Sequence, residues 1–490
     1  MNDPQAATGT AATLSSRGAA GLGRPTSVRL RAYRVGFGDC LLLTVTYPER
    51  GADAQERHVL IDLGTKESDD HGPELSQVAD LVARHSGGHL AGLLATHRHQ
   101  DHISGFGTQA IAATIDGLQP ELVIRPWTDV PDAQTPSRRL MDLDPRSLAF
   151  LGVLEGMHRT AEEITKFSFG SVTMAKRAQE LASLGFKNVA AIAALEDWGR
   201  RGRDEYVKAG DRVDVEQLLP GVTVEVLGPP TLAQVPRLTS YAKTSEEYWL
   251  ALADQDSWLA LQSQPPDARQ RARETLASPA GAGAAEWLLR ALWDARTQLD
   301  QALELVEAFD DVLNNTSVIV LVTVGTRTLL LPGDAQAENW SFTLDQALGR
   351  NGEKAQPALR RRLAEVDLYK VGHHGSLNAT PVSLFQLWEG RSPSNRPLTS
   401  VLTTKKNVYD KSKEGAVPKR RLVDALQRVG PLHSTDGLAQ DVWWFDLVAP
   451  AYGDHPFVFT PGPAQAMPPR PRAPRRPDPS PATGGRGGAA

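Results

Sequence analysis

Four side chains that can bind a metal ion occur within six residues, directly after a short apolar segment. The apolar residues 93–95 read as a buried strand, and the motif that follows is His97-Arg-His99-Gln-Asp101-His102. Where a chain leaves a strand, residues two apart can face the same way, so His97 and His99 can present their imidazoles to one ion. Asp101 and His102 can then address a second ion. Nitrogen and oxygen ligands at this density indicate zinc, with manganese or iron as alternatives.

The alternative interpretation of this motif is a polar loop with incidental histidines. Four such side chains would repel one another when protonated and would add little to a hydrophobic core, so we favour a metal site. The single cysteine, Cys40, excludes a Cys-rich metal site and an intrachain disulfide, which leaves His, Asp and Glu as ligands. The formal charge of −5 argues against a protein that coats nucleic acid, although it is compatible with a local basic groove.

Hydrophobic patterning predicts two strand-rich halves with helices between them. The first half has an alternating segment at 28–35, apolar segments at 40–43 and 59–61, and a helix that begins after Pro73. The second half repeats the scheme, with strands expected at 317–324, 328–331, 366–371 and 400–403. Two such halves predict an α/β (α+β) fold in which a sandwich of sheets is covered by helices.

Composition divides the chain into a folded domain and two terminal segments. Residues 1–26 and 451–490 are rich in small residues or in Pro, Gly and Arg and are expected to be disordered, whereas residues 27–450 form the domain. A large helical insertion is expected at about 137–311, where one helical face carries Leu288, Leu292, Ala295, Leu299, Leu303 and Val306. The strand-like segment 222–227 interrupts the insertion and can belong to a sheet.

Neither an export signal nor a membrane span is expected. The first 26 residues lack the apolar core of a signal peptide, and nowhere do about 20 apolar residues run together. A lone cysteine fits a reducing compartment. The sequence therefore predicts a cytoplasmic protein with no membrane partner.

The His-x-His-x-Asp-His motif is the signature of the metallo-β-lactamase superfamily, and the chain most resembles the hydrolase domain of ComEC-type DNA-uptake proteins. The resembling segments cover both halves but not the middle; they are 35–40, 60–64, 314–318, 330–334 and 370–376. The resemblance implies the superfamily's αββα sandwich, here with a large helical insertion, and two bound divalent metal ions. It also implies that Asp62 supports the loop with residues 97–102, called the metal loop below. Asp39 either stabilises that loop or is an ordinary turn residue.

The resemblance assigns roles to residues of the second half as well. Asp334 would bridge the two ions and His374 would ligate the second, which completes an expected ligand set of His97, His99, Asp101, His102, Asp334 and His374. We expect Asp101 to orient the attacking water. His373 directly precedes the ligand position of the family, so we expect it to face the substrate or to support the ligands. Asp101 and His373 are therefore the expected catalytic residues.

Two departures from the family pattern remove histidines. Gly228 stands in a Leu-Gly-Pro segment where family members usually have Leu-His-Pro, and residues 416–418 read Ala-Val-Pro where His-Pro is usual. The first ion would then have only two histidines and a shared carboxylate, which leaves an open position or a weak site. Alternatively, His158 in the insertion takes the missing place.

A lysine- and arginine-rich stretch follows the last metal motif. Its seven cations within seventeen residues are Lys405, Lys406, Lys411, Lys413, Lys419, Arg420 and Arg421. They can hold a phosphate backbone, or they can form a solvated loop and helix face.

Three functional hypotheses follow. The resemblance favours a phosphodiesterase or nuclease in which a metal-bound hydroxide attacks the phosphorus, with nucleic acid or a small phosphodiester as substrate. The second is hydrolysis of another small ester in a pocket that the insertion closes. The third is a metal-stabilised, non-catalytic protein whose insertion binds a protein partner.

Overall fold

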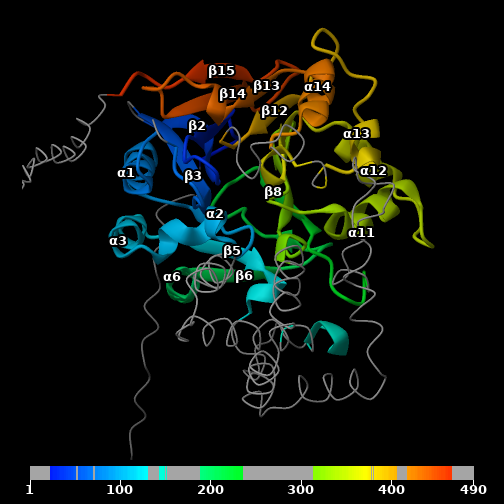
Figure 1. Ribbon diagram of the computed structural model, residues 1–490, viewed down its shortest axis with the longest axis horizontal. Coiled ribbons are helices and arrows are strands. Elements are labelled where there is room, and N and C mark those ends of the chain that lie inside the picture. Colours follow the sequence, from blue (N-terminus) through cyan, green and yellow to red (C-terminus); the bar gives the residue numbers. More distant parts are fainter. Residues whose placement is uncertain are drawn as a thin grey trace, which may run out of the picture.

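The computed structural model describes residues 22–50, 53–69, 72–130, 143–148, 151, 188–235, 313–376, 378, 380–405 and 417–465. These residues form two mixed sheets that face each other, with helices on the outer side of each (Figure 1). The class predicted from the sequence, a fold that mixes strands and helices, is therefore confirmed.

The first sheet has eight strands in the order β15-β14-β1-β2-β3-β4-β5-β6. Its strands from β15 to β3 pair antiparallel, and those from β3 to β6 pair parallel. The bounds are β1 Ser27–Tyr33, β2 Cys40–Arg50, β3 Asp53–Leu63, β4 Gly92–Leu94, β5 Leu122–Pro126, β6 Arg203–Val207, β14 Trp444–Pro450 and β15 Val458–Pro461.

The second sheet has seven strands in the order β13-β12-β11-β10-β9-β8-β7. Here the strands from β7 to β10 pair antiparallel and those from β10 to β13 pair parallel. The bounds are β7 Arg212–Val213, β8 Val222–Gly228, β9 Ile319–Val324, β10 Arg327–Leu331, β11 Leu368–Lys370, β12 Thr399–Leu402 and β13 Leu432–Ser434.

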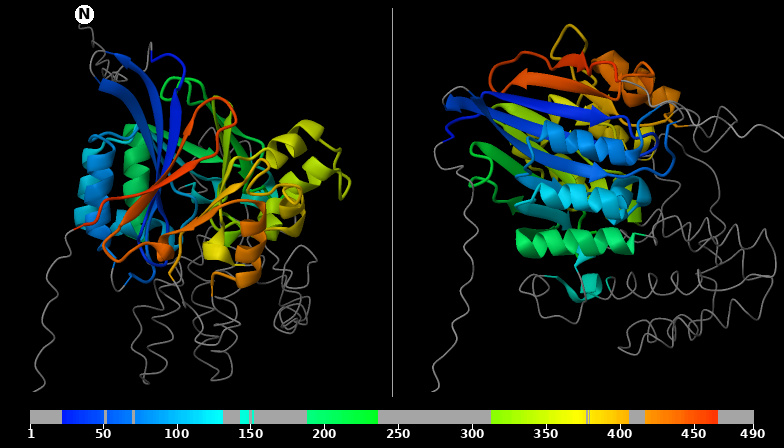
Figure 2. Two further views of the ribbon diagram at one scale, coloured as in Figure 1. Left: turned by 90° about the horizontal axis from the view of Figure 1, so that it is seen from above. Right: turned by 90° about the vertical axis from the view of Figure 1, so that its left-hand side faces the viewer.

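Helices cover the outer face of each sheet (Figure 2). On the first sheet lie α1 Leu75–His85, α3 Gln109–Gly117 and α6 Val189–Arg201. On the second lie α11 Ala337–Leu348, α12 Pro357–Ala364, α13 Val382–Gln386 and α14 Arg420–Val429. The short helix α2 Gln100–Ile103 belongs to the loop after β4.

Strand alternation explains this layering. Successive side chains of a strand point to opposite faces, so Leu43 of β2 packs between the sheets while its neighbour Leu42 packs against the helices. In the second sheet, Leu331 and Leu330 of β10 divide in the same way. Each sheet therefore has two buried faces, which gives four layers, with one hydrophobic core between the sheets and one between each sheet and its helices.

The turns that carry the predicted ligands meet at one edge of the sandwich. The His-rich motif follows β4 and supplies His102, Asp334 follows β10, and His374 follows β11. Within each sheet these strands belong to the parallel part, and the carboxyl ends of parallel strands lie at the same edge. The fold thus brings loops from both halves together.

Most of the predicted elements are present, and two boundaries need correction. The helix expected after Pro73 is α1, and the strand-like segment 222–227 is β8 of the second sheet. The terminal segment expected to be disordered from 451 contains β15, which pairs with β14. Likewise, Leu22 of the segment 1–26 is buried in the core between the sheets.

The predicted insertion at about 137–311 also contributes to the layers. Its residues 188–235 include α6, β6, β7 and β8, so this part is not a separate helical cap. The helical face around Leu288 lies outside the described residues, as do residues 1–21 and 466–490. In the described ranges no helix is long and apolar enough to cross a membrane.

Candidate metal centre

The loop after β4 is tied to the end of β3 by one buried carboxylate. Asp62, which is fully buried, accepts hydrogen bonds from the backbone N–H of Thr96 at 2.8 Å and from its hydroxyl at 2.7 Å. The same carboxylate lies 2.7 Å from Nδ1 of His102. It therefore fixes the beginning and the end of the His-rich motif and turns Nε2 of His102 outward from the loop. The supporting role expected for Asp62 matches this geometry.

Two glycines let the first-half turns approach the metal loop. A Cβ on Gly64 would lie 2.5 Å from the backbone N of His102, and a Cβ on Gly38 would lie 2.3 Å from the carbonyl oxygen of Gly64. Only glycine fits at such distances. The turn at 36–39 consequently packs directly on the motif, where the backbone N–H of Asp39 donates to the carbonyl oxygen of Asp101 at 2.9 Å.

The second half supplies Asp334 and the pair His373 and His374. Asp334 accepts a hydrogen bond at 3.0 Å from the backbone N–H of His373. His373 and His374 have φ angles of 42° and 51°, in the left-handed region, so the chain turns sharply after β11. Nδ1 of His374 donates to the carbonyl oxygen of Thr403 at 2.9 Å. That bond leaves Nε2 of His374 as the nitrogen available to an ion.

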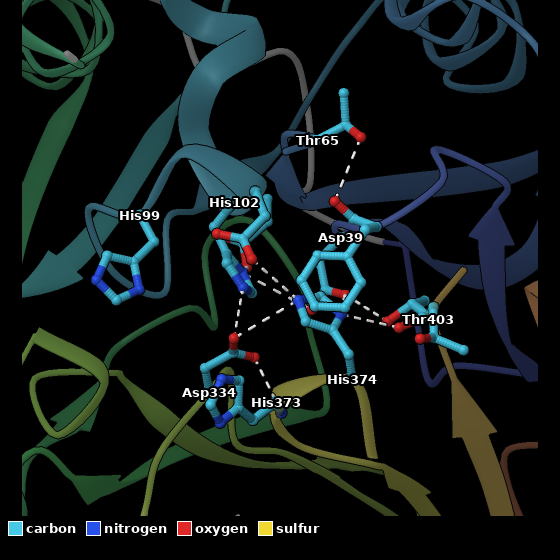
Figure 3. Close-up of polar contacts among 12 residues, drawn as sticks. Asp39, Thr65, His99, His102, Asp334, His373, His374 and Thr403 are labelled. Carbon is cyan, nitrogen blue, oxygen red and sulfur yellow. Dashed lines mark hydrogen bonds and ion pairs between the residues drawn. The ribbon is translucent and has the colours of Figure 1, made fainter. Parts of the chain in front are cut away.

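Asp101, His102, Asp334 and His374 converge in one buried group. One ligand atom from each lies within 4.8 Å of the others. Nε2 of His102 is 3.0 Å from Oδ2 of Asp334 (Figure 3), and Nε2 of His374 is 3.1 Å from Oδ2 of Asp101. Two imidazoles and two carboxylates facing one another suit a divalent ion that prefers nitrogen and oxygen ligands.

His97 and His99 lie beside this group rather than in it. Nε2 of His97 is 2.9 Å from Nδ1 of His99, and the ring of His97 is 4.2 Å from that of His102, centroid to centroid. Figure 3 shows His99 to one side of His102. The structure thus gathers four of the six expected ligands at one point and places the other two next to them as a pair. Two imidazole nitrogens this close can address one ion.

Electrostatics separates the histidines into two kinds. Burial lowers the pKa of His102 and His374, but Asp334 and the neighbouring carboxylates raise it by more, so both pKa values lie above the ordinary value. Burial raises the pKa of Asp334, but His102 and His374 lower it by more. Burial and His102 depress the pKa of His97, which is therefore neutral. Binding of a divalent ion would displace the protons from the charged imidazoles.

His373 differs from the other site histidines in its exposure. It is only half-buried, whereas His374 is fully buried. Its Nδ1 lies 3.3 Å from Oδ1 of Asn378. The side chain therefore lies at the margin of the buried group. Its ring is 6.3 Å from that of His374, centroid to centroid, and its backbone N–H binds Asp334.

Sequence reasoning missed two residues that support the site, Lys370 and Thr403. Lys370 ends β11 with 1% of its surface exposed and forms an ion pair with Asp39. Thr403, directly after β12, contacts both His374 and Asp39. The signal for Lys370 was a charged residue inside an otherwise apolar strand pattern, next to the His-His pair. Asp39 is a buried supporting residue rather than only a turn residue.

Gly228 is closely packed at the position where the family pattern would place a histidine. A Cβ at this position would lie 2.1 Å from Oδ1 of Asn339 and 2.8 Å from Cδ1 of Ile319. Asn339 is itself fixed, because its Nδ2 donates to the carbonyl oxygen of Ser317 at 2.7 Å. A histidine at position 228 would therefore require Asn339 and Ile319 to shift. His158 lies outside the described residues.

The basic stretch divides into parts with different surroundings. Nζ of Lys405 binds Oε1 of Glu67 at 2.7 Å and the carbonyl oxygen of Ser68 at 2.8 Å, so its charge is compensated. Residues 406–416, with Lys406, Lys411 and Lys413, lie outside the described ranges. Lys419, Arg420 and Arg421 begin α14. The backbone N–H of Lys419 donates to the carbonyl oxygen of Gly375 at 3.0 Å, which attaches α14 to the loop of His374.

Comparison with known protein families and curated proteins does not identify the function of this site. No protein-family model matches the chain, and no curated protein matches it. Its function is therefore inferred from the geometry of the buried group and from the sequence motifs.

Proposed function

We propose that the chain is a metal-dependent hydrolase of the metallo-β-lactamase superfamily that cleaves phosphodiester bonds. The observation that carries this proposal is the buried group of Asp101, His102, Asp334 and His374, drawn from loops of both halves. Two sheets with helices on their outer faces, and a His-x-His-x-Asp-His motif directly after a buried strand, support the superfamily.

The donor set fits a divalent ion, zinc first, with manganese or iron as alternatives. Asp101, His102, Asp334 and His374 would hold one ion, and His97 and His99 would contribute to a second with Asp334 in common. Such ions lower the pKa of a coordinated water and polarise a phosphoryl oxygen. The protein's own contribution is orientation. Asp62 and the Thr403 carbonyl each occupy one nitrogen of a ligand imidazole and leave the other free for metal.

Two further residues have roles at the substrate side of this proposal. The carboxylate of Asp101, which lies 3.1 Å from Nε2 of His374, would orient a water molecule in the site. The half-buried His373 lies at the margin, from which its imidazole can contact a substrate oxygen. The pKa of His373 is depressed, mainly by burial, so at neutral pH it is an uncharged hydrogen-bonding group.

A polymeric phosphodiester is favoured over a small one by the beginning of α14. Lys419, Arg420 and Arg421 follow one another there, and the side chain of Arg420 is 92% exposed. The first turn of α14, which the structure describes in full, has no acidic residue. Cations at a helix N-terminus are unfavourable for the helix dipole, and the ion pair of Arg420 with Asp424, 3.7 Å long and largely exposed, offsets little of that cost. A polyanion bound next to the loop of His374 would explain these three cations.

The test is hydrolysis of single-stranded DNA, double-stranded DNA, RNA and a chromogenic phosphodiester, with and without a chelator. We expect chelator-sensitive cleavage of at least one nucleic acid. Asp101→Asn should remove it, whereas Asp197→Asn, at a half-exposed position on α6, should leave it intact. Cleavage of carboxylic esters or thioesters alone would contradict the phosphodiester assignment. No hydrolysis by a metal-loaded protein would favour a non-catalytic role.

A further inference from the structure

Lys370 is a buried cation, so contact with solvent does not explain why a charged residue occupies this position. It lies at the carboxyl end of β11 with 1% of its surface exposed. Its Nζ forms an ion pair with Oδ2 of Asp39 and lies 4.0 Å from Oδ1 of Asp334. Burial lowers the pKa of Lys370, but Asp39 and Asp334 raise it by more, so the ammonium group keeps its proton.

Its partner Asp39 contacts ligand segments from both halves of the molecule. In the first half, its backbone N–H donates to Asp101, and its Oδ2 lies 3.7 Å from Nδ1 of His102. In the second half, its Oδ1 accepts a hydrogen bond from the hydroxyl of Thr403 and lies 3.9 Å from Nδ1 of His374. The pair of Asp39 and Lys370 thus lies behind the candidate ligands and joins the two halves.

Stability alone does not account for this pair. Moving two charges out of water costs several kcal/mol per ion, and well-packed apolar replacements of a buried ion pair are often neutral or stabilising. Lys370 also offsets one of the four carboxylate charges of Asp39, Asp62, Asp101 and Asp334, which belong to two buried groups that have His102 in common. A buried cation that is paired with Asp39 and lies near Asp334 is therefore suited to influence how the ligands are held.

We propose that Lys370 is a positioning residue, which together with Asp39 fixes the ligands of the first half relative to Asp334 and His374 of the second. This inference rests on the proposed metal site. The pair acts through the ligands and does not touch the ion. Without it, the two halves still fold and pack, but the ligand atoms lose their common geometry.

The test replaces both members of the pair at once. Asp39→Asn with Lys370→Met leaves the net charge of the site unchanged, so altered metal binding cannot be attributed to a change in total charge. Cobalt(II) is the probe, because its visible absorption reports ligand geometry. We expect the double variant to unfold at the temperature of the unmodified protein or above. Its cobalt spectrum should change, and its cobalt affinity should fall about 10- to 100-fold.

The control is a second ion pair between strands, Arg31 of β1 and Asp446 of β14, which make two hydrogen bonds of 2.7 Å. Arg31→Met with Asp446→Asn should change the unfolding temperature and leave the cobalt spectrum unchanged. If the double variant of Asp39 and Lys370 does not fold, Thr403→Val is the second test. It removes only the hydrogen bond that the Thr403 hydroxyl donates to Asp39, and it should shift the cobalt spectrum in the same direction.

The outcomes are distinguishable. A folded double variant, or a folded Thr403→Val variant, with the spectrum and cobalt affinity of the unmodified protein would overturn the positioning role of the pair. Failure of the unmodified protein to bind cobalt would instead remove the metal site, and with it both the proposed function and this inference.

Discussion

Nδ1 of His374 lies 2.9 Å from the carbonyl oxygen of Thr403. A backbone carbonyl can only accept, so Nδ1 carries the proton of this bond and Nε2 faces Asp101 and Asp334. β11 and β12 are parallel neighbours, and both residues follow the ends of these strands. The second sheet therefore orients the ligand histidine through its backbone, as Asp62 orients His102 from the first sheet.

Neutralising Asp62 should weaken metal binding without unfolding the protein. In Asp62→Asn the amide oxygen can still accept from the backbone of Thr96, but the charge that orients His102 is lost. We expect metal affinity to fall about 10- to 100-fold in a chelator competition. Asp116→Asn, at a half-exposed position on α3, is the control. Unchanged affinity in Asp62→Asn would show that this carboxylate does not support the metal loop.

Adding a methyl group at Gly228 should destabilise the fold. The Cβ would meet Oδ1 of Asn339, which cannot move without breaking its bond to Ser317. We expect Gly228→Ala to cost about 1–3 kcal/mol in urea unfolding, as overpacking does. Gly390→Ala is the matched control, because a Cβ added at Gly390 would have no atom within 4 Å and the φ of Gly390 is not positive. Equal stability of the two variants would contradict the close packing at Gly228.

Acid should destabilise the protein through His58. Burial, aided by Arg29, lowers the pKa of His58 to about 3. The unfolded chain binds a proton near pH 6.5 that the folded chain does not bind until about pH 3. Stability from this group is thus complete above pH 6.5 and is lost as the pH falls through that window. Between pH 7.5 and 5 the loss is about 2 kcal/mol.

His58→Gln keeps a hydrogen-bonding side chain next to Thr44 and does not titrate. Urea unfolding of both proteins at pH 7.5 and 5 compares the two losses directly. We expect the difference between the two pH values to shrink by about 2 kcal/mol in the variant. An identical loss of stability in both proteins would assign the acid sensitivity to other groups.

The cations at the beginning of α14 should set the salt dependence of nucleic-acid binding. Replacing Lys419, Arg420 and Arg421 by Gln removes three charges, and the slope of log affinity against log salt should flatten by about 2–3. Hydrolysis of a small phosphodiester should persist, because none of the three is a candidate ligand. The control replaces exposed cations at and before α12, namely Lys354, Arg360 and Arg361. An equal effect of both triple variants would show that the total charge of the protein, and not the cations of α14, sets the salt dependence.

Local patterns explain how much of the structure the sequence predicted. Period-two alternation marks β1, and the helical spacing after Pro73 marks α1, because these two elements bury mainly one face. The segment 222–227 stood out as a strand for the same reason. The apolar segment 40–43 marks β2, which is buried on both faces. β15 was missed, because Pro and Gly dominate the composition around it and its four residues are exposed. Its pairing with β14 is a tertiary contact that no local pattern contains.

The residues of the candidate site also differ in how far the sequence predicted them. Asp101 and His102 belong to one short motif, so spacing alone brought them together in the prediction. Asp334 and His374 entered only by resemblance, since sequence distance hides their proximity to the motif. Lys370 and Thr403 escaped both routes. Their roles depend on a carboxylate more than 300 residues earlier in the chain, and only the packing of the two sheets brings them to it.

Metal content is the most direct test of the central claim, which is that loops from both halves form one metal centre. The protein should be purified without chelator and its zinc, manganese and iron measured against protein concentration. We expect at least one divalent ion per chain. Asp334→Asn and His102→Gln should each lose most of the metal while unfolding cooperatively, because one ligand is contributed by each half. Metal content that stays equal in the unmodified protein and both folded variants would contradict the account.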